Sequence, residues 1–184
     1  DDGAWRSRGI SKTYPGDLYV TGGNISGKEN GIRITNAEGG KVEISGGNIS
    51  ASGEEGYGIY LSESATAKLY LSKDPKISKD PKISGEKADL YIGKPNAVYA
   101  SKNGQPYRGD NLTVAFTGND TEAPIILDVN NNAGKFTLVF PTDKILKQVG
   151  NNLVLGTKDV GHQDHDANGE GELPIDAEWI EWDG

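Results

Sequence analysis

The sequence predicts an all-β fold, a mostly parallel β-helical solenoid of about three regular coils followed by a β-rich closing region. Three observations predict it. The phrase "VTGGNISG" at residues 20–27 returns as "ISGGNISA" at residues 44–51, displaced by 24 residues. Short phrases in which apolar residues flank one polar or aromatic residue recur in a fixed order, the period-2 pattern of half-buried strands. The repeat length of about 24 to 28 residues is typical of solenoids.

Each coil is expected to contain three short strands. The first strand is expected at residues 18–20, 42–44 and 69–71, and the last at residues 32–34, 59–61 and 90–92, with a "GNIS" or "PKIS" phrase between them. One coil cannot bury its apolar residues alone, so the inward side chains of successive coils should stack. We therefore expect a core of three ladders: Leu18/Val42/Leu69, Ile25/Ile49/Ile77 and Ile32/Ile59/Leu90.

Glycines and prolines mark the corners of the coils. The glycines of "TGG", "SGG" and "EEGYG" are expected where a positive φ or a sharp bend is tolerated only without a Cβ. Residues 72–84, "SKDPKISKDPKIS", repeat six residues in tandem, and their prolines fit poorly inside paired strands. A lengthened corner with a local bulge is the favoured interpretation, and a loop that contacts a partner is the alternative.

The spacing of the phrases divides the chain into four parts. Residues 1–16 do not match a coil and are expected to form an N-terminal cap or linker, before coils at residues 17–92. From residue 93 the strand phrases lengthen ("NAVYA", "LTVAF", "IILDV", "FTLVF", "NLVLG"), which predicts wider final coils or antiparallel closing strands at residues 93–158. "TDKILKQV" at 142–149 is the one modest helical candidate. Residues 159–184 form an acidic tail with a Trp-containing strand, "EWIEW".

The composition excludes several kinds of site. The chain has no cysteine, which rules out a disulfide framework and a cysteine-based zinc site. Its net charge of −8 is concentrated in residues 159–184, which hold nine of the 27 carboxylates and no Lys or Arg. The nearly neutral remainder argues against nucleic acid or an anionic membrane surface as partner. No apolar run approaches the roughly 20 residues that span a bilayer, and residue 1 is Asp, so any export signal is expected to lie outside this chain.

Five phrases of the sequence are typical of a known class of surface proteins. They are "VTGGNISG", "ISGGNISA", "LYLSKDPKIS", "ADLYI" and "KFTLVFPTDKILKQVGNNLVLG". With them, residues 17–155 resemble the repetitive, right-handed parallel β-helix surface proteins, described as adhesin-like, of gut and other anaerobic bacteria. The resemblance implies a right-handed coil and a non-catalytic, extracellular module of a larger protein at the bacterial cell surface. It also implies adhesion or carbohydrate binding, with a glycan or a host or cell-surface protein as partner. A structural spacer or stalk with no ligand is the alternative.

The outward positions of the predicted strands supply a candidate binding surface. They place Tyr19, Glu43 and Tyr70 in one column, and Arg33, Tyr60 and Tyr91 in another. An aromatic ring stacks on the apolar face of a pyranose while a nearby charged group bonds its hydroxyls. The alternative is that these tyrosines only cover their sheet neighbours. The candidate ligand-binding residues are Tyr19, Arg33, Tyr60, Tyr70 and Tyr91.

The acidic tail supplies a candidate Ca²⁺ site. Its "DHDANG" matches the opening of an EF-hand-like loop, in which alternate oxygens converge on the ion. The twelfth loop position, which should be a bidentate acid, is Ile175, so a solvated acidic turn is the alternative. The candidate calcium ligands are Asp164, Asp166, Asn168, Glu170 and Glu172, and no other cofactor is expected.

Catalysis is the competing class of function, because many right-handed β-helices cleave acidic polysaccharides. A lyase needs a carboxylate cluster with a basic residue, and a hydrolase needs paired acids. The coil residues that could serve are expected in different columns, and no nucleophilic triad or phosphate-binding loop is present. We therefore expect no catalytic residues, and a lyase-like enzyme is the least favoured alternative. The residues considered are Arg33, Glu43, Asp74, Asp80 and Asp89.

Overall fold

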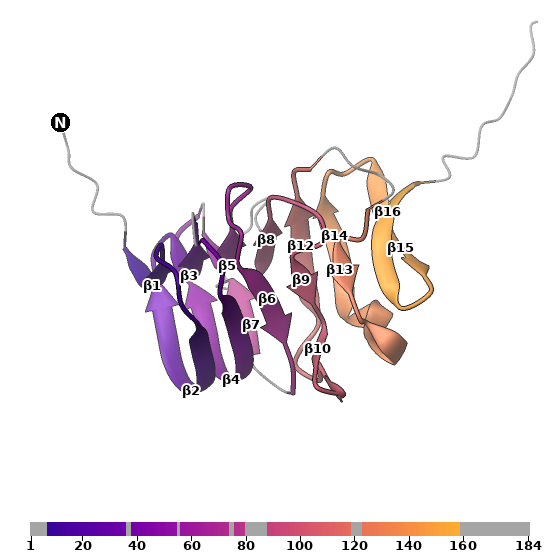
Figure 1. Cartoon of the computed structure of the whole chain (residues 1–184). Coiled ribbons are helices and arrows are strands. Elements are labelled where there is room, and N and C mark those ends of the chain that lie inside the picture. Colours follow the sequence, from indigo (N-terminus) through magenta and orange to yellow (C-terminus); the bar gives the residue numbers. More distant parts are fainter. Residues whose placement is uncertain are drawn as a thin grey trace, which may run out of the picture.

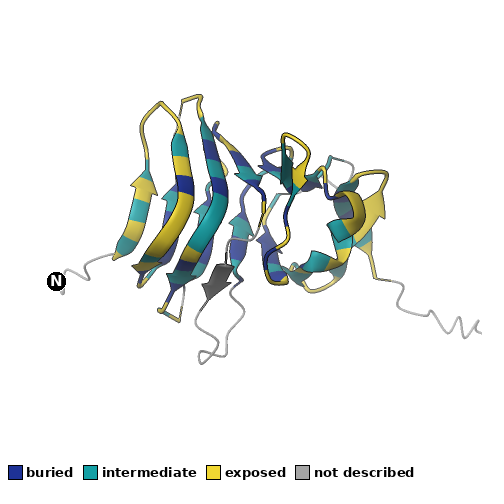
Figure 2. Ribbon diagram, turned by 90° about the horizontal axis from the view of Figure 1, so that it is seen from below, coloured by how far each residue is buried: buried dark blue, intermediate teal, exposed yellow. Residues whose placement is uncertain are grey.

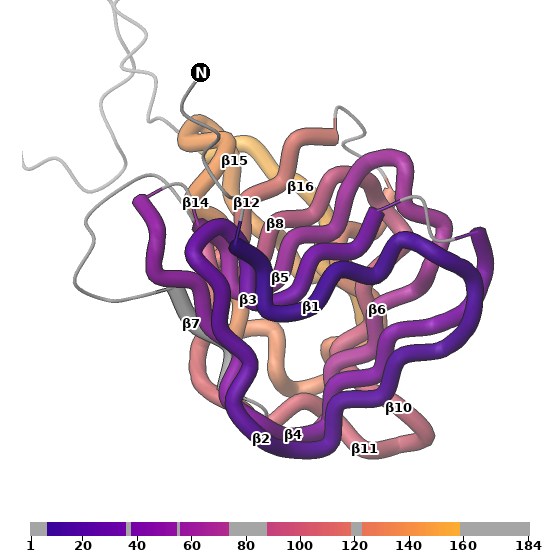
Figure 3. Tube along the Cα trace, turned by 90° about the vertical axis from the view of Figure 1, so that its left-hand side faces the viewer, coloured from indigo at the N-terminus to yellow at the C-terminus, as the bar shows by residue number. Residues whose placement is uncertain are grey.

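The structure is a computed structural model that describes residues 7–35, 38–54, 56–73, 76–79, 88–118 and 123–158, with only the backbone described at residues 76–79. Over these residues the chain forms a parallel β-solenoid of about five turns (Figure 1). Seen from its N-terminal end, the chain runs clockwise as it recedes from the viewer, so the coil is right-handed (Figure 3). The predicted fold class is confirmed, and the strands beyond the three regular coils come from residues 8–12 and from residues after 93.

One face of the solenoid is a six-stranded sheet, here sheet A, in which all neighbours are parallel. It takes one strand from each turn, because every turn returns to the same face with the same apolar and polar alternation. In spatial order its strands are β1 (Arg8–Lys12), β3 (Asn30–Ile34), β5 (Tyr57–Leu61), β8 (Leu90–Ile92), β12 (Leu112–Phe116) and β14 (Phe136–Phe140).

The other strands of the solenoid belong to an eight-stranded sheet, here sheet B. Its strands run parallel except at β16, which pairs antiparallel with both β13 and β15. In spatial order they are β2 (Leu18–Gly27), β4 (Lys41–Ala51), β6 (Lys68–Leu71), β9 (Val98–Tyr99), β13 (Ile126–Leu127), β16 (Asn152–Thr157) and β15 (Lys144–Val149), with β7 (Lys76–Lys79) also paired to β4.

Sheet B turns a corner within β2 and β4, which gives the coils three faces. The register between these two strands shifts around residues 20–24, at the glycine pairs of the repeated phrase. Gly23 and Gly47 adopt φ of 85° and 93°, a conformation that favours glycine. A Cβ at Gly46 would lie 2.4 Å from the Thr21 carbonyl oxygen, whereas a Cβ at Gly22 would meet nothing within 4 Å. The glycines therefore form the predicted corner. The close approach of a neighbouring backbone excludes a Cβ at Gly46, in the copy of the phrase that another turn covers, but not at Gly22.

The core includes the three predicted ladders and extends beyond them through the other inward residues of both sheets. The strand registers pair Leu18 with Val42 and Leu69, Ile25 with Ile49 and Ile77, and Ile32 with Ile59 and Leu90. The ladder residues of the interior turns whose side chains are described are at most 1% exposed. Leu18 and Ile25, in the first turn, are only partly buried. Figure 2 shows the resulting alternation of buried and exposed residues along the strands.

The last turns differ in shape from the first. Strands β12 and β14 extend sheet A, β9 and β13 extend sheet B, and β15 and β16 form an antiparallel hairpin at its edge. The predicted helical candidate at 142–149 was wrong: Lys144–Val149 is strand β15, because pairing along all of β16 outweighs its weak helical pattern. The 3-10 helix η1 (Asn130–Lys135) and the small hairpin of β10 (Ser101–Lys102) and β11 (Gln105–Pro106) complete the fold.

The predicted cap or linker at residues 1–16 contains a strand of the solenoid. Strand β1 pairs parallel with β3 and puts Ile10 in register with Ile32 of the ladder. Sequence analysis missed it because "GISK" has a single large apolar residue, too short a pattern to match a coil. The tandem segment is described only in part: its first "KIS" lies in β7, in register with β4, and the second copy lies outside the described residues.

Candidate functional site

The five predicted ligand-binding residues lie on two faces, so they do not form one site. Arg33, Tyr60 and Tyr91 occupy adjacent positions on β3, β5 and β8 of sheet A. Tyr19 and Tyr70 lie on sheet B, in register with Glu43 between them. Strands in one sheet are about 4.8 Å apart, so Tyr19 and Tyr70 are about two such spacings from each other.

The sheet A residues form a closed stack, here the tyrosine stack: Arg33, Tyr57, Tyr60 and Tyr91. The rings of Tyr60 and Tyr91 are nearly parallel, with centroids 4.5 Å apart and an interplanar angle of 4°. The Arg33 guanidinium carbon lies 5.1 Å from the Tyr60 centroid, and the tilted Tyr57 ring lies 5.0 Å from that of Tyr91. These contacts use the ring faces, which a sugar would need for stacking.

Polar contacts in the tyrosine stack indicate partial burial. The Tyr91 and Thr117 hydroxyls share a hydrogen bond of 2.8 Å that joins two turns. Burial is the main reason that the pKa of Tyr60 lies above its ordinary value, and the neighbouring Tyr91 adds to the effect. The buried Nε of Arg33 has no hydrogen-bond partner among the described residues. The stack therefore serves mainly to join successive turns of sheet A.

The sheet B residues form a second arrangement, here the lysine–tyrosine ladder, in which Tyr19 is the only exposed tyrosine: Tyr19, Tyr70 and Tyr99 with Lys41, Lys68 and Lys102. Tyr70 and Tyr99 are in register on β6 and β9, with ring centroids 4.7 Å apart at 22°. The Lys102 ammonium lies 4.2 Å from the Tyr70 centroid. The Lys68 Nζ donates a hydrogen bond of 2.9 Å to the Tyr99 hydroxyl and lies 5.2 Å from its ring centroid.

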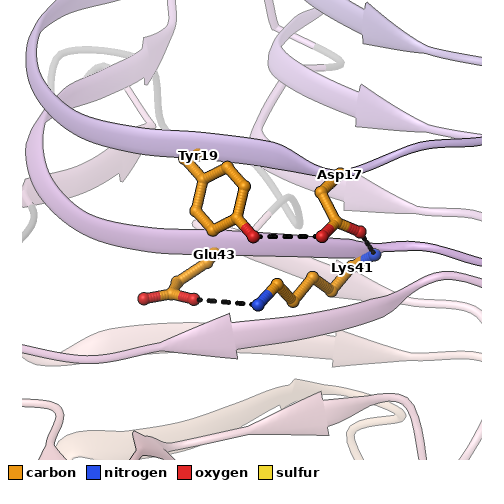
Figure 4. A network of polar contacts seen from close by, with 4 residues as sticks. All are labelled: Asp17, Tyr19, Lys41 and Glu43. Atoms are coloured by element: carbon orange, nitrogen blue, oxygen red, sulfur yellow. Dashed lines mark hydrogen bonds and ion pairs between the residues drawn. The ribbon is translucent and has the colours of Figure 1, made fainter.

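Tyr19 occupies the N-terminal end of this ladder and is 56% exposed. Its hydroxyl donates to the Asp17 carboxylate at 3.0 Å, and the Lys41 backbone N–H donates to the same carboxylate at 2.9 Å (Figure 4). The bond from the Lys41 N–H is the main reason that the pKa of Asp17 lies below its ordinary value, followed by that from Tyr19. The Lys41 ammonium lies 3.8 Å from a Glu43 carboxylate oxygen and 5.0 Å from the Tyr19 ring centroid.

A cavity of about 260 Å³ lies beside the lysine–tyrosine ladder, at the corner where two successive turns enter β6 and β9. Two lysine side chains, Lys68 and Lys94, belong to its lining. No Asp or Glu is among the lining residues. The full lining is Thr66, Ala67, Lys68, Lys94, Pro95, Asn96 and Ala97.

The residues considered for catalysis are separated in the structure. Arg33 is in the tyrosine stack and Glu43 is on the sheet B face. The Asp89 carboxylate accepts hydrogen bonds from the backbone N–H and the hydroxyl of Thr113, each at 2.8 Å, and so links two turns. Asp74 and Asp80 lie outside the described residues. Among these five residues, the described ones do not bring two carboxylates together, because Glu43 is on sheet B and Asp89 precedes a strand of sheet A.

The candidate calcium ligands at residues 164–172 also lie outside the described residues, so the calcium site stays a prediction. Across the described ranges, no group of three or more His, Cys, Asp or Glu side chains could hold a metal ion. Within the same ranges, no helix has the length and apolar character needed to cross a bilayer.

Sequence analysis missed several members of the two surfaces. Tyr99 could have been predicted from the sequence. Val98 of "NAVYA" continues the ladder of Leu69, so the next residue, Tyr99, points outward beside Tyr70. Tyr57 precedes a recognised strand phrase by two residues and was left out of it. Lys68 and Lys94 line the cavity because of how the corners before β6 and β9 fold. Lys102 lies over the Tyr70 ring because of how the β10–β11 hairpin folds. No repeat in the sequence specifies either of these conformations.

Comparisons with protein-family models, curated proteins and solved structures gave no match. The resemblance to bacterial β-helix surface proteins therefore stays an expectation, and any function must be argued from the two faces of the solenoid.

Proposed function

We propose that this chain is a non-catalytic carbohydrate-binding module and that the lysine–tyrosine ladder is its binding face. The observation that carries the proposal is the exposed Tyr19 ring in line with Tyr70 and Tyr99, with ammonium groups beside all three rings. Aromatic surface next to hydrogen-bond donors is the combination that sugar recognition requires.

The repeat of the solenoid suits a chain-like ligand. Outward side chains recur along the axis at the strand spacing of about 4.8 Å, which is close to the length of one sugar residue in an extended polysaccharide. A polysaccharide lying along the axis would meet Tyr19, Tyr70 and Tyr99 in turn, with Glu43 available to accept hydrogen bonds from hydroxyls. Many weak contacts of one kind would then add up along the ligand.

The proposed setting is the surface of a bacterial cell, where the module would be one part of a larger protein that adheres to a glycan or to a host or neighbouring cell. The chain has no cysteine, so the β-ladders and their core must hold the module together.

Glycan-array binding and affinity electrophoresis in polysaccharide-containing gels test the proposal. We expect retention by at least one polysaccharide, and a loss of about tenfold, equal to about 1.4 kcal/mol, for Tyr19→Ala. Tyr14→Ala is the matched control, because Tyr14 is 79% exposed and belongs to neither tyrosine surface. Absence of binding to every polysaccharide tested would refute the proposal, and equal losses for both variants would remove the ladder as the binding face.

A structural spacer is the second candidate, and the tyrosine stack favours it. There, outward tyrosines and an arginine cover each other and bridge turns of sheet A, a role that needs no ligand. A spacer predicts no retention by any glycan on the array and an unchanged absence of retention for Tyr19→Ala.

A further inference from the structure

The lysines of the binding face point to a class of ligand. We infer that the module binds an anionic polysaccharide, with a carboxylate or sulfate held by Lys68 and Lys94 at the corner cavity beside the lysine–tyrosine ladder. This inference rests on the proposed function and adds the charge of the ligand to it.

The Lys68 ammonium is held in place at the edge of the cavity. It donates to the Tyr99 hydroxyl at 2.9 Å and lies 3.4 Å from the Asn96 carbonyl oxygen. An ammonium group has three donors, so one remains for an anion. Because the two protein contacts already fix the long side chain, binding an anion costs less side-chain entropy there than at a mobile surface lysine.

Lys94 supplies a second cationic side chain from the next turn. It belongs to the lining of the same cavity, with Thr66 as a nearby hydroxyl group. Two lysines that line one hollow attract an anion more strongly than two isolated surface lysines, because the walls of the hollow exclude part of the water.

Two acids on the ladder face are engaged by other groups, whereas Glu63 lies beside Gly93, the residue before Lys94. Glu43 pairs with Lys41, and Asp17 accepts bonds from Tyr19 and the Lys41 backbone. In the part of the chain that the structure describes, none of Lys68, Lys94 and Lys102 forms an ion pair with a carboxylate. Lys102 lies against the Tyr70 ring at 4.2 Å, so it extends the cationic surface toward the aromatic residues. A ligand anion would therefore bind ammonium groups that form no ion pair with a described carboxylate.

The test uses three probes with one backbone: dextran, carboxymethyl-dextran and dextran sulfate. Affinity electrophoresis of the full chain measures the dissociation constants at about 0.1 M and about 1 M salt, between which the Debye length falls from about 10 Å to about 3 Å. We expect at least one charged probe to bind about tenfold or more tightly than dextran, with the preference lost at high salt. Carboxymethyl-dextran and dextran sulfate separate the two anion chemistries.

Two variants locate the effect. Lys68→Gln/Lys94→Gln should weaken binding of the charged probe about tenfold. The control Lys147→Gln/Lys158→Gln makes the same change in net charge at exposed positions that line neither this cavity nor the one at Lys28, and it should change binding less than about twofold. Lys94→Gln alone keeps the Lys68 contacts and serves if the double variant does not fold.

The outcomes separate the inference from the function it rests on. Equal binding of the charged probes and dextran, or equal losses for the two double variants, would overturn the anionic site. Binding of other glycans on the array without binding of either charged probe would overturn the inference and leave the proposed function standing. Absence of binding to every glycan would refute both.

Discussion

The two tyrosine surfaces of this solenoid use the same residue type on the same repeated frame, yet their neighbours differ. In the tyrosine stack, the Tyr60 and Tyr91 ring centroids lie 4.5 Å apart at 4°, with the Arg33 guanidinium over the Tyr60 ring and the tilted Tyr57 ring against Tyr91. In the lysine–tyrosine ladder, the Tyr70 and Tyr99 rings lie 4.7 Å apart at 22°, with separate ammonium groups beside them, and Tyr19 stays 56% exposed. A column of tyrosines is therefore a consequence of stacking turns in register. The groups around the column decide whether it can also bind.

The largest expected effect tests whether the tyrosine stack is structural. Tyr60→Ala/Tyr91→Ala should lower the free energy of unfolding by about 2–4 kcal/mol, because it removes partly buried ring area and a stacked pair that contributes about 0.5–1.5 kcal/mol beyond burial. Urea denaturation followed by circular dichroism measures the change, with Tyr14→Ala as the control. At a temperature where the double variant remains folded, glycan retention should equal that of the parent. Loss of retention there would assign binding to sheet A instead.

Two single Tyr→Phe substitutions, with smaller expected effects on stability, compare the tyrosine hydroxyls of the two surfaces. Tyr99→Phe removes the acceptor that holds Lys68, and Tyr91→Phe removes the bond to Thr117, while both keep their ring stacking. Each should cost about 0.5–1.5 kcal/mol of stability, the net value of one hydrogen bond. Only Tyr99→Phe should also weaken binding of a charged polysaccharide, as measured by affinity electrophoresis. An equal loss of binding for Tyr91→Phe would contradict the division between the surfaces.

The Arg33 side chain offers a finer test of the tyrosine stack. Its guanidinium contributes a cation–π contact of about 0.5–1 kcal/mol, offset by a buried Nε that lacks a partner among the described residues. Arg33→Met keeps the apolar stem, so unfolding free energy should fall by no more than about 1 kcal/mol. Thermal and urea unfolding measure it, and a loss as large as that of the double tyrosine variant would show that the charge holds the stack together.

The smallest expected effect is the pH dependence at Asp17. The pKa of this carboxyl is lower in the folded chain than its ordinary value of 3.8, so its contribution is present above that value and is lost as pH falls through the folded pKa. The difference in melting temperature between the parent and Asp17→Asn should therefore shrink below about pH 4. Melting curves from pH 7 to pH 3 measure it, and a difference that stays constant over this range would rule out the ionised carboxylate as its source.

The repeat in the sequence predicts which residues form the core ladders. A displacement of one turn places Leu18 on Val42 and Ile32 on Ile59, and the alternation of apolar and polar residues decides which side chains point inward. The outward columns follow from the same register, which is why Tyr60 and Tyr91 were placed together correctly. Sequence patterns with a fixed period specify both faces of a stacked sheet at once.

The remaining features depend on interactions that have no period. Strand β15 was a helical candidate because its own pattern is ambiguous, and only the hairpin with β16 decides its conformation. Lys102 reaches Tyr70 because Ser101–Lys102 starts a small hairpin beside β6 and β9. The lysines that distinguish one tyrosine surface from the other come from corners and hairpins, so the sequence indicated two aromatic columns without indicating how they differ.

The glycines of the repeated phrase have a consequence for how such chains change. Gly22 and Gly46 hold equivalent places in "TGG" and "SGG", but a methyl group at Gly46 would come within 2.4 Å of the Thr21 carbonyl oxygen while one at Gly22 would meet open space. At this corner, tolerance of a side chain therefore depends on whether another turn lies against the glycine. Elsewhere in the first turn the constraint remains, because a Cβ at Gly27 would lie 2.1 Å from the Asn30 carbonyl oxygen. A repeat protein can thus lose the likeness between its copies first at the exposed end of a corner column, while positions that the chain itself covers keep their glycine.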